Sequence, residues 1–199
     1  MDYVYEIEDV LPKEICEIII KRYDKDSRKY ESKIGQGVID KEMRRSKVLP
    51  FTSYSDWGDV DRVIKDVISR SIIEYVVYIA ETFKKTNLVA IESVHKQMKD
   101  TFSSMKDEGY FIQEYKEGDF YAWHVDHSKG MTVKRVLSFV LYLNTLNENQ
   151  GGCTEFINGK KVRPIQGKMV VFPSDWQHFH TGAPVKNGGV KYTIGTWAA

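Results

Sequence analysis

Apolar residues recur at helical spacing in two stretches of the amino-terminal half of the chain. The first stretch covers 13–23, where every fourth position is apolar: Ile15, Ile19 and Tyr23. The second covers 59–83 and keeps one apolar side for about six turns. Residues three to four apart share a face of a helix, so both stretches predict amphipathic helices. The longer helix must pack its apolar side against a large, flat partner.

Between these helices the apolar rhythm is lost. Residues 24–33 mix both signs of charge, and Gly35 and Gly37 follow directly. Charged residues without periodicity and closely spaced glycines are typical of loops. We expect a solvated loop over 24–33.

After about residue 105 the pattern changes to short β-rich runs separated by turn residues. The six runs are 111–115, 136–143, 154–156, 161–163, 168–172 and 191–197. Short strands at this spacing predict an antiparallel sandwich or barrel. Because helices precede strands, the expected fold class is α+β, with the helices covering one sheet of a jelly roll.

Composition narrows the class of protein. The chain has 199 residues, is 42% hydrophobic and carries 29 basic against 28 acidic residues, a net charge of +1. These values predict one folded domain and do not favour a nucleic-acid partner. The sequence has neither an apolar run long enough to cross a bilayer nor a signal peptide at its start, so we expect no membrane partner and a cytoplasmic location. Cys16 and Cys153 are too few and too far apart for a disulfide framework, and we expect both to be reduced.

Four of the five histidines lie in two groups, His124-Val-Asp126-His127 and His178-Phe-His180. On a strand, His124 and Asp126 would point to the same face and could reach one cation. A histidine from a distant strand would complete a facial triad of two imidazoles and one carboxylate. Such a triad leaves coordination positions open and is typical of non-haem Fe(II) oxygenases. Strand periodicity leaves both His178 and His180 as candidates for the third ligand.

The residues around these histidines form several ordered blocks: 115–126, 135–144, 151–156, 164–173, 180–185 and 189–197. The first block, Tyr-Lys-Glu-Gly-Asp-Phe-Tyr-Ala-Trp-His-Val-Asp, is similar to a Tyr-x-x-Gly-x-x-Tyr-x-x-His-x-Asp pattern. Together the blocks resemble the prolyl 4-hydroxylase-like branch of the 2-oxoglutarate- and Fe(II)-dependent oxygenases. The short Arg44-Arg-Ser46 segment resembles the amino-terminal region of that family. The segment from Phe172 to Trp176 resembles phage-encoded members.

The resemblance implies a set of site residues. The implied iron ligands are His124, Asp126 and His180, because Pro184 follows His180 at the family's spacing. The implied 2-oxoglutarate pocket consists of Lys191, Tyr142, Tyr115 and Thr154. Lys191 and Tyr142 would hold the distal carboxylate, since a buried carboxylate without a cation would be costly.

Three further residues, Tyr121, Arg135 and Trp197, resemble positions that face the substrate. Each assignment has a simpler reading from the residues alone. Aromatic side chains also serve as core, so Tyr142 on an apolar strand could be only a packed residue. Arg135 could be an ordinary charge at a sheet edge.

The fold implied by the resemblance is a distorted double-stranded β-helix, a jelly roll of the cupin type, with amino-terminal helices on one sheet. We expect a single domain over 1–199, with helical support over about 1–104 and the catalytic β-barrel over about 105–199. The implied reaction is hydroxylation of a C–H bond, with succinate and CO2 as co-products. The implied cofactors are Fe(II), 2-oxoglutarate and O2, with ascorbate as a reductant.

The expected substrate is peptidyl proline, so the expected partner is a proline-containing polypeptide. One alternative is an oxygenase that acts on a small molecule or a free amino acid. A nucleic-acid dealkylase is disfavoured because the Arg-x-Asn-x-Thr-x-Arg signature of that branch is absent after His180. Another alternative is a jelly-roll binding module without catalysis, which would not need Lys191 or the metal ligands. The sequence leaves the oligomeric state open.

Overall fold

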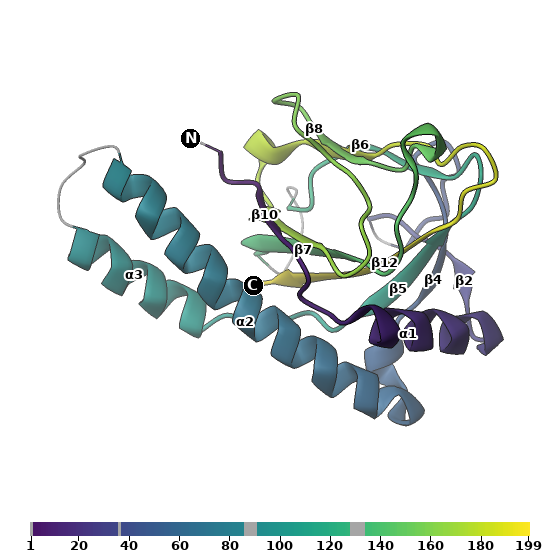
Figure 1. Ribbon diagram of the computed structural model, residues 1–199, viewed down its shortest axis with the longest axis horizontal. Coiled ribbons are helices and arrows are strands. Elements are labelled where there is room, and N and C mark those ends of the chain that lie inside the picture. Colours follow the sequence, from purple (N-terminus) through teal and green to yellow (C-terminus); the bar gives the residue numbers. More distant parts are fainter. Residues whose placement is uncertain (1, 36, 86–90, 128–133) are drawn as a thin grey trace.

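The computed structural model describes residues 2–35, 37–85, 91–127 and 134–199. Its elements form three layers: helices on one side, a large sheet in the middle and a smaller sheet on the other side (Figure 1). All strand pairs are antiparallel. The predicted combination of helices with antiparallel sheets is confirmed.

The larger sheet has seven strands in the order β1-β10-β7-β12-β5-β4-β2. Their bounds are β1 Tyr5–Ile7, β2 Tyr30–Glu31, β4 Lys47–Leu49, β5 Phe111–Tyr115, β7 Leu137–Tyr142, β10 Met169–Pro173 and β12 Lys191–Ala198. The smaller sheet has five strands in the order β3-β6-β11-β8-β9. Their bounds are β3 Arg44–Arg45, β6 Phe120–His124, β8 Thr154–Phe156, β9 Lys161–Val162 and β11 His180–Gly182.

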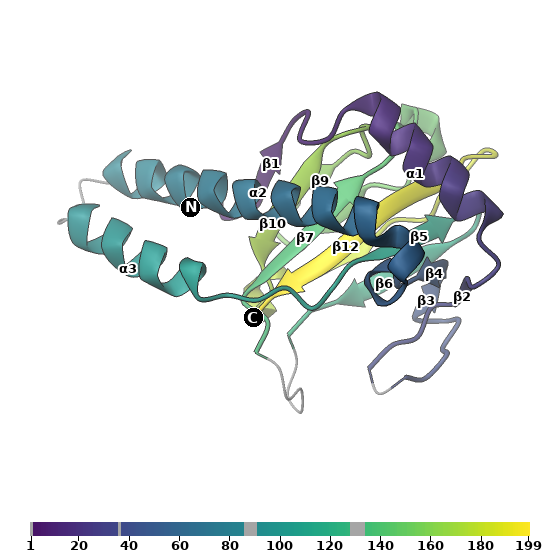
Figure 2. The same cartoon turned by 90° about the horizontal axis from the view of Figure 1, so that it is seen from below.

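Helices α1 (Lys13–Lys25) and α2 (Gly58–Lys85) lie across the outer face of the large sheet (Figure 2). Helix α3 (Ile91–Ser103) runs beside the carboxyl-terminal part of α2, where Phe102 meets Tyr75 edge to face. Four short 3-10 turns complete the described elements: Phe51–Ser53, Ser55–Trp57, Glu148–Gln150 and Trp176–His178.

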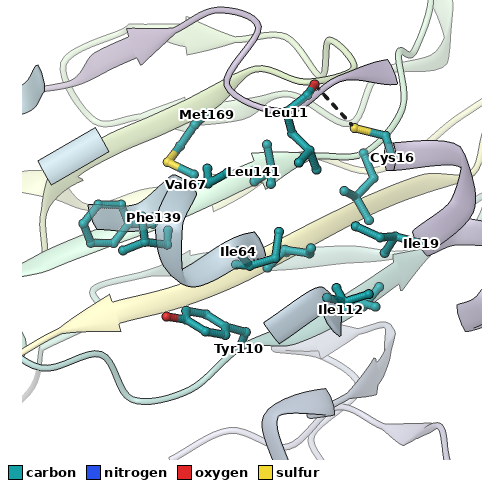
Figure 3. Packing of buried hydrophobic residues seen from close by; sticks show 14 of the residues in the cluster. Leu11, Cys16, Ile19, Ile64, Val67, Tyr110, Ile112, Phe139, Leu141 and Met169 are labelled. Atoms are coloured by element: carbon teal, nitrogen blue, oxygen red, sulfur yellow. Dashed lines mark hydrogen bonds between the residues drawn. The ribbon is translucent and has the colours of Figure 1, made fainter. Parts of the chain in front are cut away.

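The main hydrophobic core lies between the helices and the large sheet (Figure 3). Cys16 and Ile19 of α1 and Ile64 of α2 pack there against Ile112 and Leu141 of the sheet. Alternate strand residues point the other way and form a second cluster between the two sheets. The helical periodicity predicted from the sequence therefore marks the buried face of α1 and of α2.

The central strand β12 shows how this alternation builds the site. Ile194 and Ala198 belong to the core under the helices, whereas Lys191, Thr193 and Gly195 line a cavity between the sheets. Because side chains alternate along a strand, one face of β12 packs under the helices and the other face lines the cavity.

The amino-terminal half contributes more than helices. Strands β1, β2 and β4 join the large sheet and β3 joins the small one. The loop predicted over 24–33 is wrong at its end, because β2 pairs there with β4 at the sheet edge. Both residues of β2 are exposed, so no apolar alternation could reveal it. Helix α3 was not predicted either.

Within the described residues, no helix combines the length and apolar character needed to cross a membrane.

Candidate metal and cosubstrate site

Two adjacent strands of the small sheet bring three metal-ligating side chains together. His124 ends β6 and His180 begins β11, and the two residues are direct partners in the strand register. With Asp126 they form a group whose ligand atoms all lie within 4.8 Å of one another. Among the described residues, no second group of three or more such side chains was found.

The distances in this group suit a shared cation. The Nε2 atom of His124 lies 3.5 Å from Asp126 Oδ1, and Nε2 of His180 lies 3.7 Å from Asp126 Oδ2. Both separations exceed an ordinary hydrogen bond but would allow one ion to reach all three groups.

The second nitrogen of each imidazole already has a partner. His124 Nδ1 lies 2.8 Å from the Ala122 carbonyl oxygen, and His180 Nδ1 lies 3.0 Å from the His178 carbonyl oxygen. A carbonyl can only accept, so Nδ1 donates and the Nε2 lone pair remains for a metal. Burial also lowers the pKa of His180 to about 4, which keeps its imidazole neutral.

The carboxylate of Asp126 completes a suitable donor set. Burial by itself would raise its pKa, but the neighbouring imidazoles and a hydrogen bond from Ser138 lower it. The side chain is therefore an anion beside two imidazoles, a donor set that fits a divalent cation.

Two local predictions about this group are wrong. Asp126 does not share a strand with His124, because β6 ends at His124 and Asp126 lies in the bend that follows. His178 and His180 do not share a strand face, because His178 ends a 3-10 turn. The structure brings His180 to the group, whereas His178 Nδ1 pairs with Asp175 Oδ1 at 2.7 Å.

A cavity between the sheets joins this group to Lys191. Both histidines, Asp126 and Lys191 line it. The Lys191 ammonium is 3% exposed, donates to the Gly152 carbonyl oxygen at 2.9 Å, and is absent from the ion pairs formed by the described residues. Burial lowers its pKa to about 8. A buried cation without a carboxylate is a suitable site for a carboxylate ligand.

The carbonyl group that accepts the hydrogen bond from Lys191 belongs to a turn that requires glycine at position 152. Its φ is 73°, in the left-handed region, and a Cβ there would lie 2.7 Å from Leu146 Cδ1. Only glycine fits this turn without displacing its neighbour.

The other predicted pocket residues lie at different depths. Thr154 and Tyr115 line the cavity. Tyr142 is fully buried behind it, and its hydroxyl lies 2.6 Å from Thr154 Oγ1. Any contact of Tyr142 with a ligand in the cavity would thus run beside Thr154.

The predicted substrate-side residues form two stacked groups. Tyr121 stacks on the His124 ring, with centroids 3.5 Å apart. Arg135 lies over the Trp197 ring at 3.5 Å, pairs with both carboxylate oxygens of Glu108 at 2.7 Å, and donates to the Asp126 carbonyl oxygen at 3.2 Å. The guanidinium is therefore fixed in place next to the metal-ligating segment.

The sequence did not single out Arg44, although it lines the same cavity. It is 9% exposed, lies over the Tyr121 ring at 4.4 Å and donates to the Tyr115 hydroxyl at 3.4 Å. Its Nε has no hydrogen-bond partner among the residues that the structure describes. The signal in the sequence was the short Arg44-Arg-Ser46 match, which points to the family but not to the cavity.

The part of the chain that contains this site is similar to a known family. Residues 110–199 match the model of the 2OG-Fe(II) oxygenase superfamily. This part of the chain, a little under half of it, is similar to that superfamily. The resemblance predicted from the sequence is confirmed, and so are the cofactors Fe(II), 2-oxoglutarate and O2 at the level of the superfamily. Ascorbate and a phage origin stay predictions.

Two curated relatives are hydroxylases. A PKHD-type hydroxylase of Synechococcus sp. (strain CC9902) is 34% identical over 80 residues, which cover 39% of this chain and 35% of the relative. A PKHD-type hydroxylase of Prochlorococcus marinus (strain NATL2A) is 30% identical over 90 residues, which cover 44% of this chain and 40% of the relative. The chain thus matches less than half the length of either relative.

Solved structures share the fold of this chain over nearly its whole length. The viral collagen prolyl hydroxylase of Paramecium Bursaria Chlorella virus-1, in its 2OG complex, has a TM-score of 0.67 at 21% identity, covering 99% of this chain and 96% of that one. A Trichoplax adhaerens prolyl hydroxylase in complex with a hypoxia inducible factor peptide fragment has a TM-score of 0.73 at 14% identity, covering 100% and 84%. A Pseudomonas putida prolyl-4-hydroxylase has a TM-score of 0.64 at 20% identity, covering 98% and 91%. At these identities the similarity is one of fold.

Proposed function

We propose that the chain is a 2-oxoglutarate- and Fe(II)-dependent dioxygenase that hydroxylates peptidyl proline. The observation that carries this proposal is that a His-Asp-His group and a buried lysine line one cavity, and that this lysine has no carboxylate partner among the described residues. A metal site alone would not need the lysine, and an anion site alone would not need the three ligands. The prolyl hydroxylases among the structural neighbours, one of them with a bound peptide, support the choice of substrate.

In this proposal His124, Asp126 and His180 hold the iron, with the His180 imidazole neutral and the carboxylate ionised. The bound iron, 2-oxoglutarate and O2 supply the oxidising chemistry, whose co-products are succinate and CO2. The chain's task is to leave the remaining iron positions open and to exclude water between the sheets.

Lys191 neutralises the distal carboxylate of 2-oxoglutarate as that group leaves water. The Thr154 hydroxyl, paired with Tyr142, adds a hydrogen-bonding group that faces the cavity. Tyr115 forms a wall beside Lys191, whose Nζ lies 4.6 Å from the centre of its ring. These residues fix the direction in which the cosubstrate lies.

Tyr121, Arg135 and Trp197 form the substrate side. Their aromatic rings suit a pyrrolidine ring, and the Arg135 guanidinium, fixed by Glu108, suits a peptide carbonyl. A fixed substrate-side surface brings one C–H bond to the iron and keeps others away.

The test is incubation of the purified chain with Fe(II), 2-oxoglutarate and a set of proline-containing peptides. We expect succinate formation stimulated by peptide, and one added oxygen mapped to proline by mass spectrometry. Methylated DNA or RNA should give no stimulation. Succinate without oxidised peptide would contradict the substrate but keep the oxygenase, and no succinate under any condition would contradict the enzyme itself.

A free amino acid is the second candidate substrate, and Arg44 is the observation that favours it. Its guanidinium is buried and has no carboxylate partner within the described part of the chain, so it could bind the carboxylate of such a molecule. Free proline belongs in the same assay. Oxidation of free proline with peptides untouched would favour this second candidate.

A further inference from the structure

The position of Asp126 is not fixed by a strand. Strand β6 ends at His124, so the strand register that aligns His124 with His180 does not extend to the carboxylate. Another part of the molecule must therefore hold Asp126 in its place beside the two imidazoles.

Two buried serines lie behind the carboxylate in one continuous chain of hydrogen bonds. Ser138 of β7 donates its hydroxyl to Asp126 Oδ2 at 2.6 Å, and Ser174 Oγ lies 2.7 Å from Ser138 Oγ. An ionised carboxylate can only accept, so the single Ser138 proton points to Asp126. The Ser174 hydroxyl must then be the donor to Ser138. The order of donation is thus Ser174 to Ser138 to Asp126.

The main chain of Ser174 also forms hydrogen bonds with the backbone close to Asp126. The Ser174 carbonyl accepts from the His127 N–H at 2.9 Å, and the Ser174 N–H donates to the Val136 carbonyl at 3.0 Å. Ser138 and Ser174 are 0% and 2% exposed, so water does not compete for these hydroxyls. Hydrogen bonds to Ser174 and Ser138 therefore hold both the backbone of His127 and the carboxylate of Asp126.

We propose that Ser138 and Ser174 are positioning residues that hold Asp126 as a metal ligand through one oxygen. This inference rests on the proposed function, since it needs a metal at the group. Ser138 occupies Oδ2 and fixes the plane of the carboxylate, which leaves Oδ1 directed toward the side of His124. Hydrogen bonds behind a ligand typically change metal affinity or activity by about 10- to 100-fold.

The chain contains a matched control for this pair. Ser32 and Ser46 also lie with their hydroxyl oxygens 2.7 Å apart, and they are 3% and 8% exposed. This second pair joins strand segments rather than a metal ligand, because the Ser32 N–H also donates to the Ser46 carbonyl. Loss of a buried hydroxyl can therefore be compared at two places, with and without a ligand carboxylate attached.

The experiment is a titration of the full chain with Co(II) alone, followed by the absorbance of the bound ion. We expect Ser138→Ala to weaken Co(II) binding by about 10- to 100-fold and to alter the spectrum of the bound ion. Ser174→Ala should weaken binding less, since it only frees the Ser138 hydroxyl to rotate, and Ser32→Ala should bind as the unaltered chain does. Thermal melting of the metal-free variants shows that each one folds.

Equal Co(II) affinity and spectra in the unaltered chain, Ser138→Ala and Ser174→Ala would overturn the inference and leave the metal site standing. If Ser138→Ala does not fold, Ser174→Ala decides by the same comparison. An unaltered chain that binds no Co(II) would remove the metal site, and with it both this inference and the proposed function.

Discussion

At the residue scale, the chemistry of Lys191 is set by its burial. The ammonium lies between strands with a backbone carbonyl as its hydrogen-bond acceptor, and its pKa falls to about 8 because the charged form loses water. Folding therefore holds a cation in a place that costs stability unless an anion joins it. In the proposed function, the carboxylate of 2-oxoglutarate is the anion that joins it.

We expect Lys191→Ala to raise the KM for 2-oxoglutarate by about 10- to 100-fold, because a charge-assisted hydrogen bond contributes about 1.5 to 3 kcal/mol. Co(II) binding should stay intact. Lys168→Ala is the control, since Lys168 is also buried but pairs with Glu6 and Glu8. An unchanged KM in Lys191→Ala would place the carboxylate elsewhere.

The lowered pKa of Lys191 predicts a pH dependence for cosubstrate binding. Below pH 8 the free chain already carries the ammonium, whereas above pH 8 a proton must be taken up as the dianion binds. The affinity for 2-oxoglutarate should thus fall up to tenfold per pH unit above about pH 8. Calorimetric titration with Co(II) in place of iron measures it. In Lys191→Arg the charge persists, so an identical pH dependence there would show that another group is responsible.

The two candidate histidines can be separated by single substitutions. His180→Ala should abolish Fe(II)-dependent turnover and Co(II) binding, because it removes one of three ligands. His178→Ala should leave the metal bound, since that imidazole pairs with Asp175. Metal content after dialysis decides the matter, and iron lost from His178→Ala but kept by His180→Ala would reverse the assignment.

At the scale of elements, the sequence predicts those that have a clear apolar pattern, periodic in the helices and nearly continuous in the strands of the large sheet. Helices α1 and α2 and strands β5, β7, β10 and β12 were all predicted from such patterns. Strand β6 was missed because its run of aromatic residues does not alternate, and β11 because its sequence, His-Thr-Gly, contains no apolar β-rich run. These two strands carry the proposed ligands His124 and His180, so the prediction of the metal site rested on motif similarity instead of periodicity.

Arg44 was also missed as a residue of the cavity. It lies in the two-residue strand β3, which pairs with β6 far along the chain. Nothing near position 44 in the sequence indicates that its side chain will meet Tyr121 and Tyr115 in a cavity. Long-range strand pairing decides this placement, and local patterns do not encode it.

Helix α2 offers a test of the predicted buried face. Ile64 is 0% exposed and Ile73 is 66% exposed, although both lie on the same helix. Ile64→Ala should lower the free energy of unfolding by about 2 to 5 kcal/mol, because it leaves a cavity under the sheet. Ile73→Ala should change it by less than about 0.5 kcal/mol. Urea unfolding of both variants measures the difference, and equal losses would refute this orientation of the helix.

At the scale of the whole molecule, the region that matches the family model depends on the region before it. The large sheet has amino-terminal strands at both edges: β1 covers β10 on one side, and β4 with β2 covers β5 on the other. The small sheet receives β3 at the edge beside β6. Helices α1 and α2 cover the outer face of the large sheet.

This arrangement limits how the protein can be divided. A fragment that starts near residue 105 would keep the three ligands and Lys191, yet it would have unpaired backbone along β10, β5 and β6 and a bare apolar sheet face. Open edges next to exposed apolar side chains promote association between molecules. A protease that cuts between α2 and α3 would therefore leave two pieces that stay together, whereas separate expression of the family-matching half should yield insoluble material.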